Sequence, residues 1–207
     1  MEIFSPNMLK TFEECQKKFE YKYIQKISAP QKITPFEKGK KIHALANYYL
    51  RNQDISKLEN TLNNEERLLW EKLKENEYLK KVFVQSEYNL SFKISDYWVG
   101  GRIDAIVKDD EQYYILDYKT GSIPQNPEYD YQTMIYLLAT YKYFNKKCSF
   151  VYINLKQDTN YKIDLTSELI NKYETRIIKI CDLISQTDSY QTSKNCDFCE
   201  YNTFCQQ

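Results

Sequence analysis

Apolar residues in the first 80 positions of the chain recur at the spacing of a helix. The Ser-Pro pair at positions 5–6 is typical of a helix start, with the serine as cap and the proline in the first turn. The apolar stripe that continues this helix to about residue 23 consists of Leu9, Phe12, Phe19 and Tyr23. We expect a linker over residues 27–35, a second helix over 36–50, and a third that begins at Asn63 or Asn64. The pattern predicts a helical N-terminal lobe.

From residue 81 onward the pattern changes to the two-residue alternation of strands. The predicted strands cover residues 81–94, 97–108, 112–120 and 148–155, with 161–165 as a candidate fifth. Residues 109–112 are expected to form a hairpin turn. The two long helices predicted in this part cover residues 127–144 and 167–185, the second capped by Ser167.

This order of elements predicts an α/β fold with a central mixed β-sheet flanked by helices. A three-stranded meander is followed by a crossover helix and a further strand. We interpret the 207 residues as a single domain. Its segments are the helical lobe of residues 1–80, a core of 81–165, and a C-terminal helix with a cysteine-rich tail over 166–207.

Composition and charge narrow the function only a little. The formal net charge is zero, but residues 8–41 contain nine lysines and four glutamates. On charge alone a solvated helical face is the preferred interpretation, and a phosphate-facing lobe is the alternative. No apolar leader and no run of membrane-spanning length is seen, so we expect a cytoplasmic protein whose thiols stay reduced.

The second and third predicted strands contain charged residues where a sheet core needs apolar ones. Asp117 and Lys119 lie two residues apart and share a strand face, and Asp104 lies on the preceding strand. If the strands pair, the aspartates converge, and their repulsion and desolvation are costly unless a divalent cation lies between them. Mg²⁺ and Mn²⁺ prefer oxygen ligands, and such a cation polarises a phosphate and lowers the pKa of a bound water. Lys119 can orient that water or neutralise charge on the phosphate.

The alternative is a solvent-exposed sheet edge with weak surface ion pairs. The positions of the glycines favour the cation site. Three of the four glycines in the chain are Gly100, Gly101 and Gly121, which flank the two acidic strands. At Gly100 and Gly101 we expect a bulge or a close approach of backbone.

Three further residues are candidates for the same site. His43 is the single histidine, and it follows the fourth glycine, Gly39, by one helical turn. A lone helical histidine is more often structural than a ligand, but the glycine clears the same face, and neutral imidazole binds Mn²⁺. Gln132 and Tyr136 lie at i and i+4 on the helix after the third strand and can hydrogen-bond a phosphate or a base edge. Two amphipathic residues at a helix boundary are the simpler interpretation of that pair.

Cysteines are concentrated at the end of the chain. The Cys-x2-Cys-x5-Cys pattern at 196–205, in a reduced protein, predicts a metal or cluster site, with Cys15 as candidate fourth ligand. Cys148 and Cys181 are expected to be buried apolar thiols. Zinc accepts four thiolates, but the spacing departs from the paired CxxC layout and favours an iron–sulfur cluster.

Together these residues resemble the RecB-like nucleases of the PD-(D/E)XK superfamily, in their iron–sulfur branch. That branch includes the small nucleases of CRISPR adaptation and the nuclease domains of AddB-type helicase-nucleases. The segments that carry the resemblance are, in order, "SPNMLKTFEECQKKFEYKY", "GKKIH", "GGRIDAIV", "ILDYKTG", "QTMIY" and "CDFCEYNTFC". Asp-x-Lys stands where many of the CRISPR nucleases have Glu-x-Lys, which is closer to the helicase-associated type.

The resemblance implies a restriction-endonuclease-like αβββαβ core and a metal-dependent DNA nuclease with a [4Fe–4S] cluster. The implied ligands of Mg²⁺ or Mn²⁺ are His43, Asp104, Asp117 and the Tyr118 carbonyl. The implied catalytic residues are Asp104, Asp117 and Lys119, and Gln132 and Tyr136 would contact DNA or support the site. The implied cluster ligands are Cys15, Cys196, Cys199 and Cys205. Glu87, on the first strand, is a candidate for a further acid near the metal.

The function expected from these features is that of a deoxyribonuclease, most simply an exonuclease on single-stranded DNA or on DNA ends. An integrase or a helicase is the expected kind of partner subunit, and no membrane is involved. The alternatives are a non-catalytic DNA-binding or assembly subunit of a DNA-processing complex and a zinc-stapled site-specific endonuclease. Digestion polarity, oligomeric state and pathway stay open among CRISPR adaptation, DNA repair and phage DNA processing.

Overall fold

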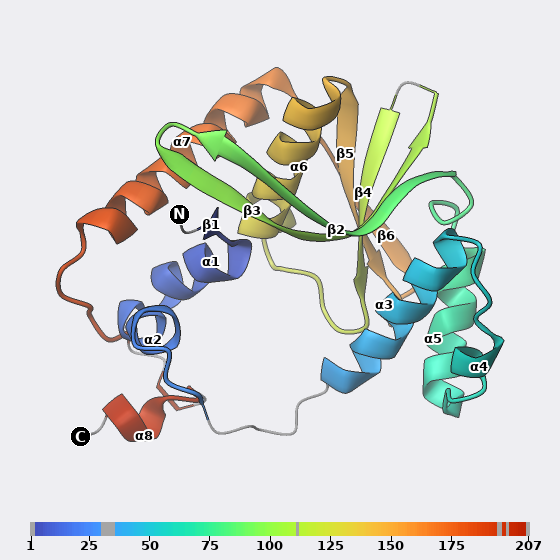
Figure 1. The fold of residues 1–207 in the computed structure, drawn as a ribbon, viewed down its shortest axis with the longest axis horizontal. Coiled ribbons are helices and arrows are strands. Elements are labelled where there is room, and N and C mark those ends of the chain that lie inside the picture. The colour runs from blue at the N-terminus through green and yellow to red at the C-terminus, as the bar shows by residue number, and fades with distance from the viewer. Residues whose placement is uncertain (1–2, 30–35, 111, 194–195, 198, 206–207) are drawn as a thin grey trace.

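The computed structural model describes residues 3–29, 36–110, 112–193, 196–197 and 199–205. Six strands form one mixed sheet in the order β1-β3-β4-β5-β6, with β2 paired to β3 (Figure 1). The strands are β1 (Ile3–Phe4), β2 (Val82–Ile94), β3 (Tyr97–Asp109), β4 (Gln112–Lys119), β5 (Lys147–Asn154) and β6 (Thr159–Asp164). The parallel β4–β5 pair is connected through a helix, while β2–β3, β3–β4 and β5–β6 are antiparallel. The predicted α/β fold with a mixed sheet is confirmed.

Helices cover both faces of this sheet (Figure 1). The helices on one side pack into a core with β4 and β5; they are α1 (Pro6–Glu14), α6 (Tyr131–Phe144) and α7 (Ser167–Gln186). Those on the other side build a second core around Trp70; they are α3 (Phe36–Leu50) and α5 (Asn64–Glu75), with the short α4 (Ser56–Glu59) beside them. Alternating residues of β4 supply the two cores, with Ile115 in the first and Leu116 in the second. This alternation explains why the sequence pattern predicted the strand well.

The long strand β3 pairs with β2 along one edge, but on its other edge β1 and β4 pair with separate parts of it and leave a stretch between them. Residues 97–108 pair with β2 along one edge, while on the other edge β1 pairs only at 98–99 and β4 only at 105–109. Gly100 and Gly101 lie in the stretch between. A Cβ at Gly100 would lie 2.4 Å from the Leu90 carbonyl oxygen, so only glycine allows the backbone of β2 to approach this closely. The predicted close approach is confirmed, but the register shift lies elsewhere, between Phe83 and Gln85.

Several element boundaries differ from the predictions. The first helix does not run unbroken to residue 23: it stops at Cys15, which is extended, and continues as α2 (Gln16–Phe19) and a π-helical turn, Glu20–Ile24. Thr166, not Ser167, caps α7, because its side chain accepts from the Leu169 N–H. The helix α6 begins at Tyr131, after a 3₁₀ turn at Pro127–Tyr129.

Other predictions of elements have mixed outcomes. The capping box at Asn63 confirms the start of α5. The short elements β1 and α4 were not predicted. Most of the predicted linker, residues 30–35, lies outside the described residues. A last short helix, α8 (Asn202–Cys205), lies in the cysteine-rich tail. The division of the chain at residues 80 and 165 stays a prediction.

Candidate metal centre

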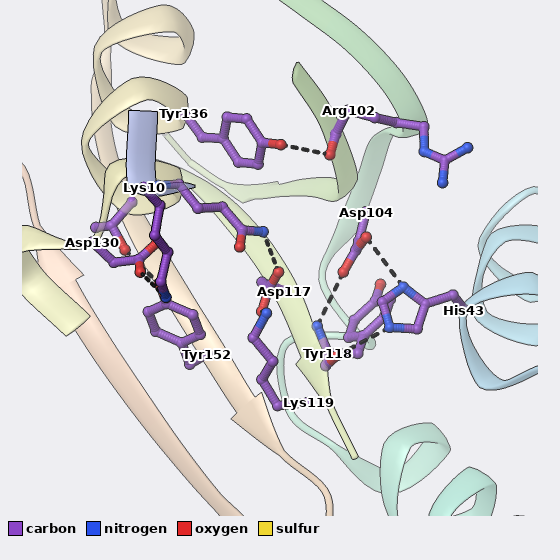
Figure 2. Close-up of polar contacts among 12 residues, drawn as sticks. Lys10, His43, Arg102, Asp104, Asp117, Tyr118, Lys119, Asp130, Tyr136 and Tyr152 are labelled. Atoms are coloured by element: carbon purple, nitrogen blue, oxygen red, sulfur yellow. Dashed lines mark hydrogen bonds and ion pairs between the residues drawn. The ribbon is translucent and has the colours of Figure 1, made fainter. Parts of the chain in front are cut away.

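A cavity of about 880 Å³ opens beside the stretch where β3 separates from β4. The helices α3 and α6, the strands β2, β3 and β4, and the first turn of α1 all contribute to its wall. Figure 2 shows His43 reaching in from α3, and Asp104, Asp117 and Lys119 on the neighbouring strands β3 and β4. Residues predicted from three separate segments of sequence therefore meet in one place, and the predicted Gln132 and Tyr136 of α6 line the same cavity.

Three carboxylates lie in a row across three neighbouring strands. In the β2–β3 pairing the position of Glu87 falls between paired neighbours and faces Asp104. The β3–β4 register ends one residue short of Asp104 and Asp117 and leads on to these two residues. Opposite residues of antiparallel strands point to the same face, where like charges repel. The expectation that Asp104 and Asp117 converge is confirmed, because both line the cavity.

His43 bridges two acceptors of the site. Its Nδ1 lies 3.1 Å from Asp104 Oδ1, and its Nε2 lies 3.0 Å from the Tyr118 carbonyl oxygen (Figure 2). Burial alone would lower the pKa of His43, but the hydrogen bond and charge of Asp104 outweigh burial and raise it. An imidazolium can donate to both acceptors at once, whereas neutral imidazole has one N–H. Both ring nitrogens of His43, the residue predicted as a cation ligand, are thus occupied by hydrogen bonds to Asp104 and Tyr118.

Asp117 is a buried carboxylate with few donors. Its side chain is 4% exposed, and burial, followed by repulsion from Asp104, raises the pKa of Asp117 to about 6. Gln132 Nε2 donates to Oδ1. Lys119 Nζ lies 2.7 Å from Oδ2 and is the ionic partner of this oxygen. A buried carboxylate oxygen in this state suits a cation ligand.

Tyr136 connects α6 to β3 at the gap in the sheet. Its hydroxyl donates to the Arg102 carbonyl oxygen at 2.9 Å, in the stretch of β3 where neither β1 nor β4 pairs (Figure 2). A Cβ at Gly101 would lie 2.6 Å from this hydroxyl. Gly101 therefore makes room for Tyr136, and the geometry supports the structural alternative for Tyr136, whose contact with DNA stays a prediction.

The donor set fits a divalent cation. Ligand atoms of His43, Glu87 and Asp104 lie within 4.8 Å of one another, and these are nitrogen and carboxylate oxygen donors of the kind that Mn²⁺ and Mg²⁺ accept. Asp117 is not in this trio; it lies on the same cavity wall, turned toward Gln132 and Lys119.

Most of these residues were predicted from the sequence, with Glu87 as a candidate for a further acid near the metal. A hydrogen-bonded group next to Glu87 was not predicted; it consists of Asn47, Arg51 and Ser86. No motif marks these three, because a helix and a strand far apart in sequence bring them together.

The four cysteines predicted to form one group do gather. Cys15 Sγ accepts from the Lys18 N–H at 3.4 Å, and α2 holds the tail through the Lys17 N–H, which donates to the Gln191 carbonyl oxygen at 3.0 Å. Burial raises the pKa of Cys205, and the charges of Cys199, Cys15 and Cys196 add to this effect, which reflects their proximity. Cys148 and Cys181 are buried, as predicted.

Comparison with known proteins gives one family match and several relatives. Residues 3–206 match the family model described as the PD-(D/E)XK nuclease superfamily. The CRISPR-associated exonuclease Cas4 of Francisella tularensis subsp. novicida is 31% identical over 121 residues, which are 57% of this chain and 61% of that protein. An uncharacterised protein of Ureaplasma parvum is 32% identical over 145 residues, which are 65% of this chain and 64% of that protein. The chain thus spans less than two thirds of the length of these curated relatives.

A solved structure supports the fold. The crystal structure of a proposed exonuclease from Eubacterium rectale superposes with a TM-score of 0.66, over 97% of this chain and 88% of that one, at 12% identity. Among the described residues, no helix has both the length and the apolar character needed to cross a membrane.

Proposed function

Because the chain belongs to the PD-(D/E)XK nuclease superfamily, we propose that it is a deoxyribonuclease that requires Mg²⁺ or Mn²⁺. The observation that carries this proposal is the cavity in which His43, Asp104, Asp117 and Lys119 meet. A surface cluster of ion pairs would not bury one carboxylate almost completely beside a second one.

The residues that would hold the cation are His43, Asp104, Asp117 and the Tyr118 carbonyl. When bound, a divalent cation supplies positive charge that stabilises the developing charge on a phosphodiester and makes a nearby water more acidic. His43 must first give up the proton that it shares with Asp104 and Tyr118. While no cation is bound, the protonated His43 thus supplies the positive charge that balances Asp104.

Lys119 and Gln132 prepare the site for the phosphodiester. Lys119 is 28% exposed on the side chain and faces the cavity, so its ammonium can donate to a phosphate oxygen as well as to Asp117. Gln132 holds one oxygen of Asp117 and so fixes the direction of the other. Tyr136 keeps β3 at its distance from α6.

We propose single-stranded DNA or DNA ends as the substrate. The cavity is lined by the cationic side chains of Lys40 and Arg102 together with the amide of Asn7 and the ring of Tyr48, which suits a flexible strand better than a rigid duplex. The relative Cas4 is named an exonuclease, which supports action at ends. An integrase or helicase as partner and a role in CRISPR adaptation or DNA repair belong to the same proposal.

We propose that Cys15 and the three tail cysteines hold a [4Fe–4S] cluster. A tetrahedral zinc site with Zn–S bonds of about 2.3 Å needs its sulfurs ~3.8 Å apart. Among the described residues, no three of these cysteine sulfurs lie within 4.8 Å of one another, although the four gather in one region. A cluster whose cysteines bind different irons requires wider spacing and so agrees better with this geometry.

Cleavage assays test the proposal. We expect the full chain to degrade end-labelled single-stranded DNA with Mn²⁺ or Mg²⁺ and not with EDTA. Lys119→Ala should abolish cleavage, while the matched surface variant Lys172→Ala should keep it, because Lys172 pairs with Glu168 on the exposed face of α7. Binding of DNA without cleavage under all these conditions would favour the non-catalytic alternative. Circular single-stranded DNA separates cutting at ends from internal cutting.

A further inference from the structure

We propose that Tyr48 is a platform on which one base of a single-stranded DNA substrate stacks. The inference rests on the proposed function and adds a binding site for the nucleotide beside the metal centre. Tyr48 lies on α3, five residues after His43, and both residues line the metal cavity. Tyr48 also lines a second cavity, of about 320 Å³, whose wall includes α4 and the residues on either side of it. The two cavities therefore adjoin at this tyrosine.

The side chain of Tyr48 is not held by the rest of the protein. Tyr48 is 44% exposed, and among the residues that the structure describes it makes no ring contact and no side-chain hydrogen bond. The next residue, Tyr49, is also exposed, but its ring packs edge-on against Trp70, with 5.6 Å between the ring centroids. Tyr49 thus anchors α3 to the second core, whereas the ring of Tyr48 is available to a ligand.

The residue one turn before Tyr48 leaves the ring accessible from the metal cavity. Side chains of a helix lean toward its N-terminus, so Tyr48 lies toward the turn that contains Ala44. Ala44 lines the same cavity, and its methyl group is too small to cover an aromatic ring. Bases of single strands stack on exposed rings of this kind, and the contact tolerates any base because every base has a π face.

The position of Tyr48 relative to the metal centre identifies which base it would take. The five residues from His43 to Tyr48 correspond to about 7.5 Å along the helix axis. This is comparable to the length of one nucleotide in an extended strand. The base on Tyr48 would therefore belong to a nucleotide next to the phosphodiester at the metal centre.

Cationic side chains lie on both sides of the proposed platform. Lys40 and Arg102 line the metal cavity, and Lys57 lines the second cavity. In the part of the chain that the structure describes, no carboxylate lies within ion-pair distance of Lys57. The acid of the second cavity, Asp54, accepts hydrogen bonds from the N–H and the hydroxyl of Ser56. The phosphates that flank a stacked base can thus each approach a positive charge.

Binding of a short, end-labelled single strand to the full chain in EDTA, measured by fluorescence anisotropy, tests this role. Tyr48→Ala should raise the Kd by ~5–150-fold, the range for stacking of one base on an aromatic ring. Tyr48→Phe keeps the ring and should bind within about twofold of wild type. The matched control is Tyr143→Ala, because Tyr143 is 62% exposed in the last turn of α6; it should also stay within about twofold.

Strands that each contain one abasic nucleotide separate stacking from other effects. In the wild type, one position near the bound end should lose affinity by a similar factor when its base is removed. In Tyr48→Ala the same removal should have little further effect, because the two partners of one contact do not contribute additively. An equal loss at that position in both proteins would show that the base does not lie on Tyr48 and would overturn the inference.

The other outcomes separate the inference from the function. If Tyr48→Ala binds and cleaves single strands as the wild type does, while Lys119→Ala cleaves none, Tyr48 is no platform and the proposed function stands. If Tyr48→Phe or Tyr143→Ala binds as weakly as Tyr48→Ala, stacking on the Tyr48 ring is not responsible and the inference is wrong. If the wild type neither binds nor cleaves single strands, the inference and the proposed function both fail.

Discussion

Replacing Asp117 by asparagine should make the cation-free protein more stable at pH 8, although it removes a catalytic candidate. The carboxyl is buried, and its pKa is raised to about 6 from an ordinary value of 3.8. At about 1.36 kcal/mol per pH unit, ionising this group in the folded state costs about 3 kcal/mol. That pKa already includes the favourable charge of Lys119, but the NH₂ group of an asparagine would face one of two donors, Gln132 Nε2 or Lys119 Nζ, and this offsets part of the gain. We expect a net stabilisation of about 1–2 kcal/mol for Asp117→Asn.

The sign of the pH dependence follows from the raised pKa. The folded state binds the proton of Asp117 more tightly than the unfolded state, so the wild type gains stability as the pH falls from 8 through 6 toward 4. Asparagine cannot titrate, so the advantage of the variant should shrink over this range and vanish near the ordinary pKa of aspartate. Urea unfolding at a series of pH values, followed by the fluorescence of the buried Trp70, measures the difference.

A control with the opposite sign comes from β3. The hydrogen bond from Lys81 lowers the pKa of Asp109, so Asp109→Asn should reduce stability at pH 8.

In saturating Mn²⁺ the wild type should become more stable than Asp117→Asn, because the wild type binds the cation and the variant binds it only weakly. An Asp117→Asn protein that is less stable than wild type at pH 8 without cations, or whose advantage does not change with pH, would refute the reasoning.

Three other substitutions test the supports of the site. Ser86→Ala leaves polar groups of Asn47 and Arg51 without their partner and should lower the free energy of unfolding by about 1–3 kcal/mol in urea titrations. Gly101→Ala places a Cβ against the Tyr136 hydroxyl and should cost about 1–3 kcal/mol and reduce cleavage, whereas a variant as stable as wild type would contradict the close contact. Cys199→Ala should remove iron from the purified protein and lower the stability of the whole fold, by up to ~5 kcal/mol if the cluster acts as a chain-closing link; retention of full iron content would exclude Cys199 as a ligand.

The strands and most helices could be predicted from the sequence because one periodicity governs each of them. Alternation along β4 sends Ile115 and Leu116 into different cores, and an Asn63 cap with Glu66 three residues on marks the start of α5. The break at Cys15 could not be predicted, because the apolar residues on either side keep helical spacing through it. The extended residue is explained by the tail that packs there, which is distant in sequence.

The candidate site was predictable where charge stands in an apolar context, and less so elsewhere. Asp104, Asp117 and Lys119 interrupt strand patterns and so attract attention in a single sequence. Glu87 does not, because β2 has other polar residues at exposed positions, namely Asn89, Ser91 and Lys93. The position of Glu87 depends on its left-handed backbone and on the hydrogen bonds that α3 makes to the preceding residue, Ser86. Neither feature has a local sequence signature.

The most direct test of the account is the position of Mn²⁺ in crystals of the full chain, located by its anomalous scattering. We predict a peak inside the cavity, at coordination distance from carboxylate oxygens of both Asp104 and Asp117 and next to His43. A peak elsewhere, or an empty cavity in crystals whose protein cleaves DNA with Mn²⁺, would contradict it.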